Sequence, residues 1–166
     1  MNSFSFMKHP HQWKQFIYVF GGTLLILNLL KNNVHIVRNN SDSLPFKSFI
    51  HLTNKKPKKG DYTLVDSLWY ETKLIKKVVG IAGDRISYTA KGELKVADLI
   101  VGSQKTKSKD GRHLTPLKAQ IIPEGQVFLY APHPSSFDSR YEELGLTPIE
   151  ALQGTAYPVG GGNPNE

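Results

Sequence analysis

Lys76-Lys77-Val78-Val79-Gly80-Ile81-Ala82-Gly83-Asp84 combines a short apolar run with two adjacent lysines and ends in a Gly-Asp turn. Short apolar runs bounded by Gly, Asp and Pro are typical of β-strands. The chain contains several of them, at residues 62–65, 75–81, 85–88, 93–96, 99–101 and 126–130. We therefore predict an all-β domain, with a polar surface loop at residues 103–115 and a single helical turn at residues 148–152.

The two lysines of this run occupy different faces of the expected strand. Alternation places Lys76 on the face of Leu74 and Val78, and Lys77 on the opposite face. Whichever face is buried therefore carries a lysine. A desolvated lysine has a lowered pKa and can act as a base near neutral pH. The alternative is an edge strand whose two lysines both reach solvent and discourage aggregation.

A candidate nucleophile lies earlier in the chain, in Ser41-Asp42-Ser43-Leu44-Pro45. Ser, Asp and Pro favour a turn, which would expose the Ser43 hydroxyl. A serine and a buried lysine that meet in space can form a serine–lysine dyad, in which an amine replaces the imidazole as base. The alternative is turn chemistry alone, because these residues are common in turns.

A third polar segment is Ser135-Ser136-Phe137-Asp138-Ser139-Arg140-Tyr141. Asp138 and Arg140 are two residues apart, so on a strand they share a face and can form an ion pair. Ser136 shares that face, and its hydroxyl could orient a nearby amine. The alternative is a polar loop with an incidental ion pair.

The N-terminal part of the chain has a different composition. Residues 16–30 carry no charge, and as a helix flanked by Trp13 and Lys31 they could span a membrane. A buried core helix would have a polar face, and a cleaved signal peptide would have small residues near its cleavage site, so we predict an uncleaved anchor. The expected organisation is an N-terminus at residues 1–15, a transmembrane anchor at 16–34, one domain at 35–159 and a disordered tail at 160–166.

Composition limits the chemistry further. The 166 residues include no cysteine, which excludes disulfides and thiolate chemistry. The six histidines are scattered without metal-ligand spacing, so we expect no metal and no cofactor. The formal charge of +7 permits contact with nucleic acid or anionic lipid. The lysines lack the interleaved aromatic residues of a single-strand binder, so we expect no nucleic-acid partner.

Taken in order behind an apolar N-terminal stretch, these segments resemble the type I signal peptidase family, and within it the TraF-like pilin-processing peptidases of conjugative transfer. Residues 41–45 resemble the family's nucleophile segment, and residues 76–84 its lysine segment. Residues 136–141 are similar to its last segment, and residues 154–159 to its closing strand. The resemblance implies a mainly β, antiparallel, barrel-like signal-peptidase fold preceded by one transmembrane helix.

The resemblance also implies a role for each candidate residue. Ser43 is the expected nucleophile and Lys76 the expected general base. The backbone N–H of Ser43, with the hydroxyl of Ser41, is the expected oxyanion hole. Ser136 is expected to orient the lysine amine, and the pair of Asp138 and Arg140 to brace the site.

The function expected from this resemblance is that of a membrane-anchored serine endopeptidase. Its domain would lie in the periplasm, on the outer side of the bacterial inner membrane, although the charges flanking the anchor do not fix the orientation. Its expected partners are membrane lipid, through the helix, and an exported precursor, most plausibly a conjugative pilin, whose product could be linear or cyclic. Two alternatives stay open: an inactive membrane-anchored assembly protein of the conjugation apparatus, and a LexA-like autoprotease.

Overall fold

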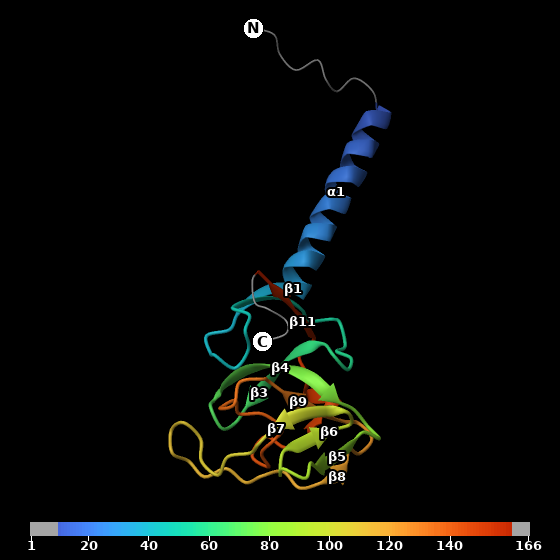
Figure 1. Cartoon of the computed structure of the whole chain (residues 1–166). Helices are drawn as coiled ribbons and strands as arrows, with labels where there is room; N and C mark the ends of the chain where they lie inside the picture. The colour runs from blue at the N-terminus through green and yellow to red at the C-terminus, as the bar shows by residue number, and fades with distance from the viewer. Residues whose placement is uncertain (1–9, 161–166) are drawn as a thin grey trace.

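The computed structural model describes residues 10–160, which form one N-terminal helix, eleven strands and one short 3-10 helix (Figure 1). The helix is α1 (Pro10–Asn33), and β1 (Val34–Arg38) follows it directly. The other elements, in chain order, are β2 (Ser48–Leu52), β3 (Tyr62–Ser67), β4 (Thr72–Gly80), β5 (Arg85–Tyr88), β6 (Leu94–Val96), β7 (Leu99–Gly102), β8 (Gln120–Ile121), β9 (Gln126–Tyr130), β10 (Thr147–Pro148), η1 (Ile149–Ala151) and β11 (Thr155–Val159).

The strands form two antiparallel sheets. The larger sheet has the order β1-β2-β11-β3-β4-β9-β10, and the smaller sheet has the order β7-β6-β5-β8. The predicted mainly β, antiparallel class is therefore confirmed, with two open sheets in place of a closed barrel in the described part of the chain. The predicted closing strand is β11, which lies between β2 and β3 and so joins the strands nearest the helix to the rest of the sheet.

Helix α1 projects away from the sheets in one direction (Figure 1). Its segment Trp13–Asn33 has 21 residues, is long and apolar enough to cross a membrane, and is not buried inside the fold. At 1.5 Å per residue it measures about 32 Å, close to the thickness of a bilayer's hydrocarbon core. A buried core helix, one of the alternatives weighed for this segment, is therefore wrong, whereas a membrane anchor and a signal sequence both satisfy this test.

The junction between helix and sheet differs from the predicted boundary. The helix begins at Pro10, ahead of the predicted anchor, and Val34, the last residue of the predicted anchor, is the first residue of β1. Val34 pairs with Leu52 of β2, and the N–H of Thr53 donates a 3.0 Å hydrogen bond to the carbonyl of Asn33. Most of the predicted N-terminal segment and nearly all of the predicted tail (residues 1–9 and 161–166) lie outside the described residues.

The sequence predicted the centre of the fold better than its periphery. The predicted strands at 85–88 and 126–130 match β5 and β9, and the predicted helical turn matches η1. Residues 103–115 form a loop that is closed by an isolated bridge between Lys107 and His113. Strands β1, β2, β8 and β10 were not predicted.

Candidate active site

Lys76 lies in β4, an interior strand of the larger sheet, where it pairs with Thr63 of β3. Only 2% of its surface is exposed. Lys77 faces the other way, is half-buried, and places its Nζ 5.7 Å from the centre of the Tyr62 ring. The alternative of an edge strand with two solvated lysines is therefore wrong, because β4 lies between β3 and β9 in the sheet and Lys76 is buried.

The buried amine has one neutral hydrogen-bond partner. Lys76 Nζ donates a 2.7 Å bond to the Oγ of Ser136. Burial lowers the pKa of Lys76 from 10.5 to about 8, while Asp138 acts to raise it and Arg140 to lower it. A lysine with this pKa is partly neutral in mildly basic solution and can then accept a proton.

Ser41 and Ser43 lie on the loop between β1 and β2, and the buried side chain of Asn39 holds this loop in place. Asn39 Nδ2 donates to the carbonyl of Phe46 at 3.0 Å, and Asn39 Oδ1 accepts from both the N–H of Ser41, at 3.1 Å, and its hydroxyl, at 2.8 Å. Sequence reasoning missed this residue, because an asparagine that anchors a loop looks the same in a sequence as one in any turn.

The two serine hydroxyls are 2.6 Å apart. The Asn39 oxygen can only accept, so the proton of Ser41 is used in that bond, and Ser43 is the donor to Ser41. In this arrangement the Ser41 hydroxyl accepts a hydrogen bond from the Ser43 hydroxyl. Its hydroxyl would have to leave Asn39 before it could donate to an oxyanion.

Ser43 and Lys76 line one cavity of about 270 Å³, which Ser41 also lines. The structure thus brings the predicted nucleophile and base to the same space without a direct hydrogen bond between them, since Ser43 is bonded to Ser41 and Lys76 to Ser136. The cavity lies between two parts of the chain that are distant in sequence, the β1–β2 loop and the first half of β4.

The strand edge beside this cavity has an unusual feature. β4 pairs with β3 along Thr72–Lys77, but its pairing with β9 starts only at Lys77. Residues 72–76 line the cavity, so this part of the strand has one edge without a strand partner among residues 10–160. Such an edge can accept an extended peptide as an added strand.

The segment that carries Ser136 contains the predicted ion pair, but not on a strand. Residues 131–141 form successive turns and bends between β9 and β10. Arg140 Nε and Nη2 donate to the two oxygens of Asp138 at 2.8 and 2.9 Å. Asp138 is 0% exposed and Arg140 1% exposed. The ion pair is therefore present, but in a loop, which was the alternative weighed for this segment, and not on a strand.

The pair also organises the backbone around it. Asp138 accepts bonds from the N–H of Ala131 at 3.2 Å and of Arg140 at 3.1 Å. Arg140 Nη2 donates to the carbonyls of His133, at 3.2 Å, and Ser136, at 3.3 Å. An irregular segment is thus held by charge-assisted hydrogen bonds in place of a β-ladder. Among residues 10–160, no group of three or more His, Asp and Glu side chains is placed to hold a metal ion.

Comparison with known proteins shows the family of this chain. The model of the family described as signal peptidase, peptidase S26, matches residues 11–159. The chain therefore belongs to the signal peptidase S26 family, and the predicted family resemblance is confirmed.

Individual relatives place the chain near its TraF-like branch, as predicted. The chain is 30% identical over 86 residues to the conjugal transfer protein TraF of Agrobacterium fabrum, covering 52% of this chain and 48% of that protein. It is also 30% identical over 86 residues to a probable conjugal transfer protein TraF of Sinorhizobium fredii, covering 52% of this chain and 45% of that protein. The chain thus spans about half the length of the curated relatives it matches.

Solved structures are also similar to this chain. One of them is a signal peptidase I from Enterococcus faecalis, with a TM-score of 0.40 and 22% identity, and the match covers 61% of this chain and 97% of that one.

The buried lysine predicts a measurable effect on stability. In the unfolded chain the amine is solvated with a pKa near 10.5, whereas in the folded protein its pKa is about 8. The unfolded state therefore binds more protons between these pH values. Burial of the charged amine lowers the free energy of unfolding by its full amount below pH 8, and this loss disappears as the pH rises to 10.5. At 1.36 kcal/mol per pKa unit, Lys76→Met raises the free energy of unfolding at pH 7 by up to about 3 kcal/mol.

Urea unfolding of the full chain in detergent at pH 7 and pH 10 measures this gain, which shrinks at the higher pH. Lys77→Met is the matched control, because Lys77 is its half-buried neighbour. A Lys76→Met gain that is absent at pH 7, or equal at both pH values, would contradict the argument.

Proposed function

We propose that this protein is a membrane-anchored serine endopeptidase of signal-peptidase type, with Ser43 as nucleophile and Lys76 as general base. The observation that carries the proposal is a lysine with 2% exposure and a pKa lowered to about 8, which lines the same cavity as the Ser43 hydroxyl. A structural lysine would gain nothing from this environment, because burial of an amine costs stability.

The first step is proton transfer from Ser43 to Lys76. The Ser43 hydroxyl turns from Ser41 toward the neutral amine, which Ser136 holds in place through the 2.7 Å hydrogen bond. The serine oxygen then attacks the carbonyl carbon of the scissile bond, and the lysine, now charged, returns its proton to the leaving amine.

The tetrahedral intermediate needs donors for its negative oxygen. The backbone N–H of Ser43 is one candidate. The Ser41 hydroxyl is the second, once Ser43 no longer donates to it and it exchanges its bond to Asn39 for one to the oxyanion. The acyl group is then transferred from Ser43 to water, which gives a linear product, or to an amine of the substrate, which gives a cyclic product.

Substrate binding is supported by the free edge of β4. An extended peptide that pairs with residues 72–76 would run along the cavity toward Ser43. Main-chain hydrogen bonds along this edge would position the scissile carbonyl with little dependence on side-chain identity, which suits a peptidase that recognises a short cleavage segment.

The pH dependence and the variants of the dyad test the chemistry. Because Lys76 acts in its neutral form, kcat/KM rises with pH through about 8. Ser43→Ala and Lys76→Ala each lower kcat/KM by about a thousandfold or more, and the double variant is no worse, because the two residues act as a unit. Ser136→Ala loses about tenfold, since the amine loses its one buried partner.

Cleavage of a precursor by the purified full-length variants measures these effects. Lys77→Ala is the control and retains most of the activity, because its side chain faces away from Lys76. Full activity of Ser43→Ala would exclude the mechanism. Loss with Lys77→Ala but not with Lys76→Ala would mean that the other lysine is the base.

We further propose that α1 anchors the protein in the bacterial inner membrane with the catalytic domain in the periplasm. The length and apolar composition of Trp13–Asn33 support the anchor, and family membership supports the orientation. A reporter enzyme that works only in the periplasm, fused to Glu166, is expected to be active. Activity only of a cytoplasm-specific reporter at the same position would reverse the topology.

The substrate is proposed to be an exported precursor with small residues before the cleaved bond, a conjugative pilin above all. The similarity to conjugal transfer proteins supports this choice. A strain that lacks this gene is expected to accumulate unprocessed pilin, recognisable by mass spectrometry. Pilin of normal mass in that strain would remove this role.

The second candidate is an inactive assembly protein of the conjugation apparatus. One observation favours it: Ser43 and Lys76 each have another hydrogen-bond partner and are not bonded to one another. Complementation separates the two functions, because an assembly protein with Ser43→Ala and Lys76→Ala would still restore conjugation.

A further inference from the structure

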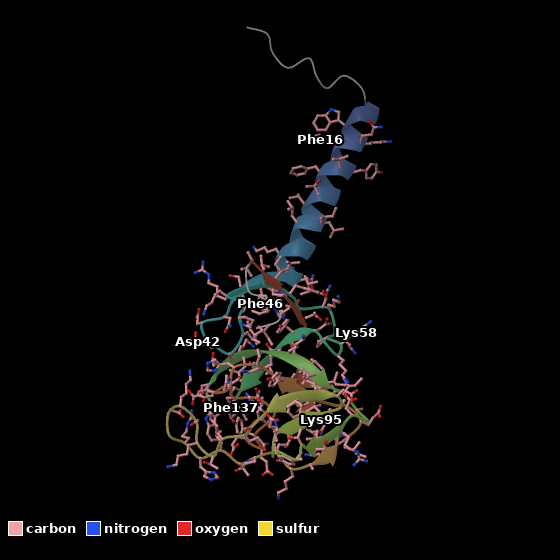
Figure 2. The ribbon with its side chains drawn as sticks, viewed as in Figure 1. Phe16, Asp42, Phe46, Lys58, Lys95 and Phe137 are labelled. Atoms are coloured by element: carbon pink, nitrogen blue, oxygen red, sulfur yellow. The ribbon has the colours of Figure 1, made fainter. Side chains whose placement is uncertain are left out.

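Ser43 lines two cavities, and the mechanism proposed above uses only one of them. The first is shared with Lys76 and the free edge of β4. The second has a volume of about 280 Å³. Its lining consists of Asp42, Ser43, Pro45, Pro132, His133 and Pro134. Figure 2 shows Asp42 on the β1–β2 loop, on the side of the domain where Phe137 marks the irregular segment after β9.

The walls of this second cavity are rigid. Three of its six lining residues are prolines, whose φ angles are fixed by their rings. His133 is held through its own backbone, because its carbonyl accepts bonds from the N–H of Ser136 at 2.9 Å and from Arg140 Nη2 at 3.2 Å. The same segment therefore positions both the partner of Lys76 and the wall that faces Ser43.

The ring of His133 is also oriented. The backbone N–H of Ser135 donates a 3.1 Å hydrogen bond to His133 Nδ1. A backbone N–H can only donate, so Nδ1 carries a lone pair and the neutral ring carries its proton on Nε2. No group of residues 10–160 forms a hydrogen bond with Nε2. The histidine thus offers one fixed, unused N–H donor at this cavity.

We propose that this second cavity binds the part of the substrate that follows the scissile bond, with His133 Nε2–H donating to a main-chain carbonyl of that part. The inference rests on the peptidase function proposed above. A peptide that lies along the edge of β4 has its acyl half in the first cavity, so the chain beyond the scissile bond continues past Ser43 into the second.

The chemistry of the second cavity defines which residue it accepts. Half of its lining residues are prolines, so a compact apolar side chain fits it. Asp42 stands at its rim with 75% of its side chain exposed and its carboxylate 3.6 Å from Lys47. A substrate with an acidic residue directly after the cleaved bond is therefore disfavoured.

Peptides of different length beyond the scissile bond test the proposal on the full-length protein in detergent. Two peptide amides share one acyl half that ends in alanine and continue for one or for three alanines after the bond. One hydrogen bond predicts that the longer peptide has a kcat/KM about three to ten times that of the shorter. In His133→Ala this ratio falls to about one.

Two further variants of His133 show whether the ratio of the two kcat/KM values depends on the N–H donor of this residue. His133→Gln restores part of the ratio, because its amide can donate from a similar position, and His133→Phe does not. His113→Ala is the matched control, since His113 is an exposed histidine that lines neither cavity, and it keeps the wild-type ratio.

Each other result overturns the proposal. A ratio that persists in His133→Ala means that the histidine does not touch the leaving segment. A wild-type ratio of one means that the second cavity binds no part of the peptide. If the wild-type protein cleaves neither peptide nor its natural precursor, the peptidase function fails and this inference fails with it.

Discussion

The buried ion pair of Asp138 and Arg140 is the interaction on which the geometry of the site depends. The chain between β9 and β10 makes few ladder hydrogen bonds, yet it carries Ser136 and His133. Arg140 binds the carbonyls of both residues, and Asp138 fixes the position of the guanidinium. Since both charges are fully buried, removing either one leaves the other uncompensated, which costs about 3–5 kcal/mol.

Under the proposed mechanism, the same pair allows Lys76 to act as the base. A lone carboxylate near a buried amine would favour the charged form and raise its pKa. Here Asp138 is bound by Arg140 through two hydrogen bonds, and the two charges act on Lys76 in opposite directions. Burial is then the dominant effect, and it lowers the pKa. The neutral hydroxyl of Ser136 orients the amine without stabilising its charge as a carboxylate would.

Much of this could be predicted from the sequence, but the choice between neighbouring residues could not. Turn residues delimit β5 and β9, so these strands were predicted with the bounds observed. Alternation could not decide between Lys76 and Lys77, because the face that is buried depends on what packs over it, and the segment that carries Ser136 comes from a distant part of the chain. The role of Asn39 was equally invisible, since its bonds depend on the path of the loop and not on its composition.

The direct connection between α1 and β1 relates the site to the membrane under the proposed anchoring. The helix ends at Asn33, and the strand begins at Val34. The N–H of Thr53, the residue after β2, donates a hydrogen bond to the carbonyl of Asn33. The five residues of β1 span about 17 Å at most, after which the loop with Ser43 begins. In Figure 1, β1 runs across the base of the helix, so its length does not lead straight away from the helix end. Under the proposed function, the nucleophile thus lies on the first loop after the helix and its adjoining strand, with no flexible linker between, which suits a precursor that is held in the same membrane.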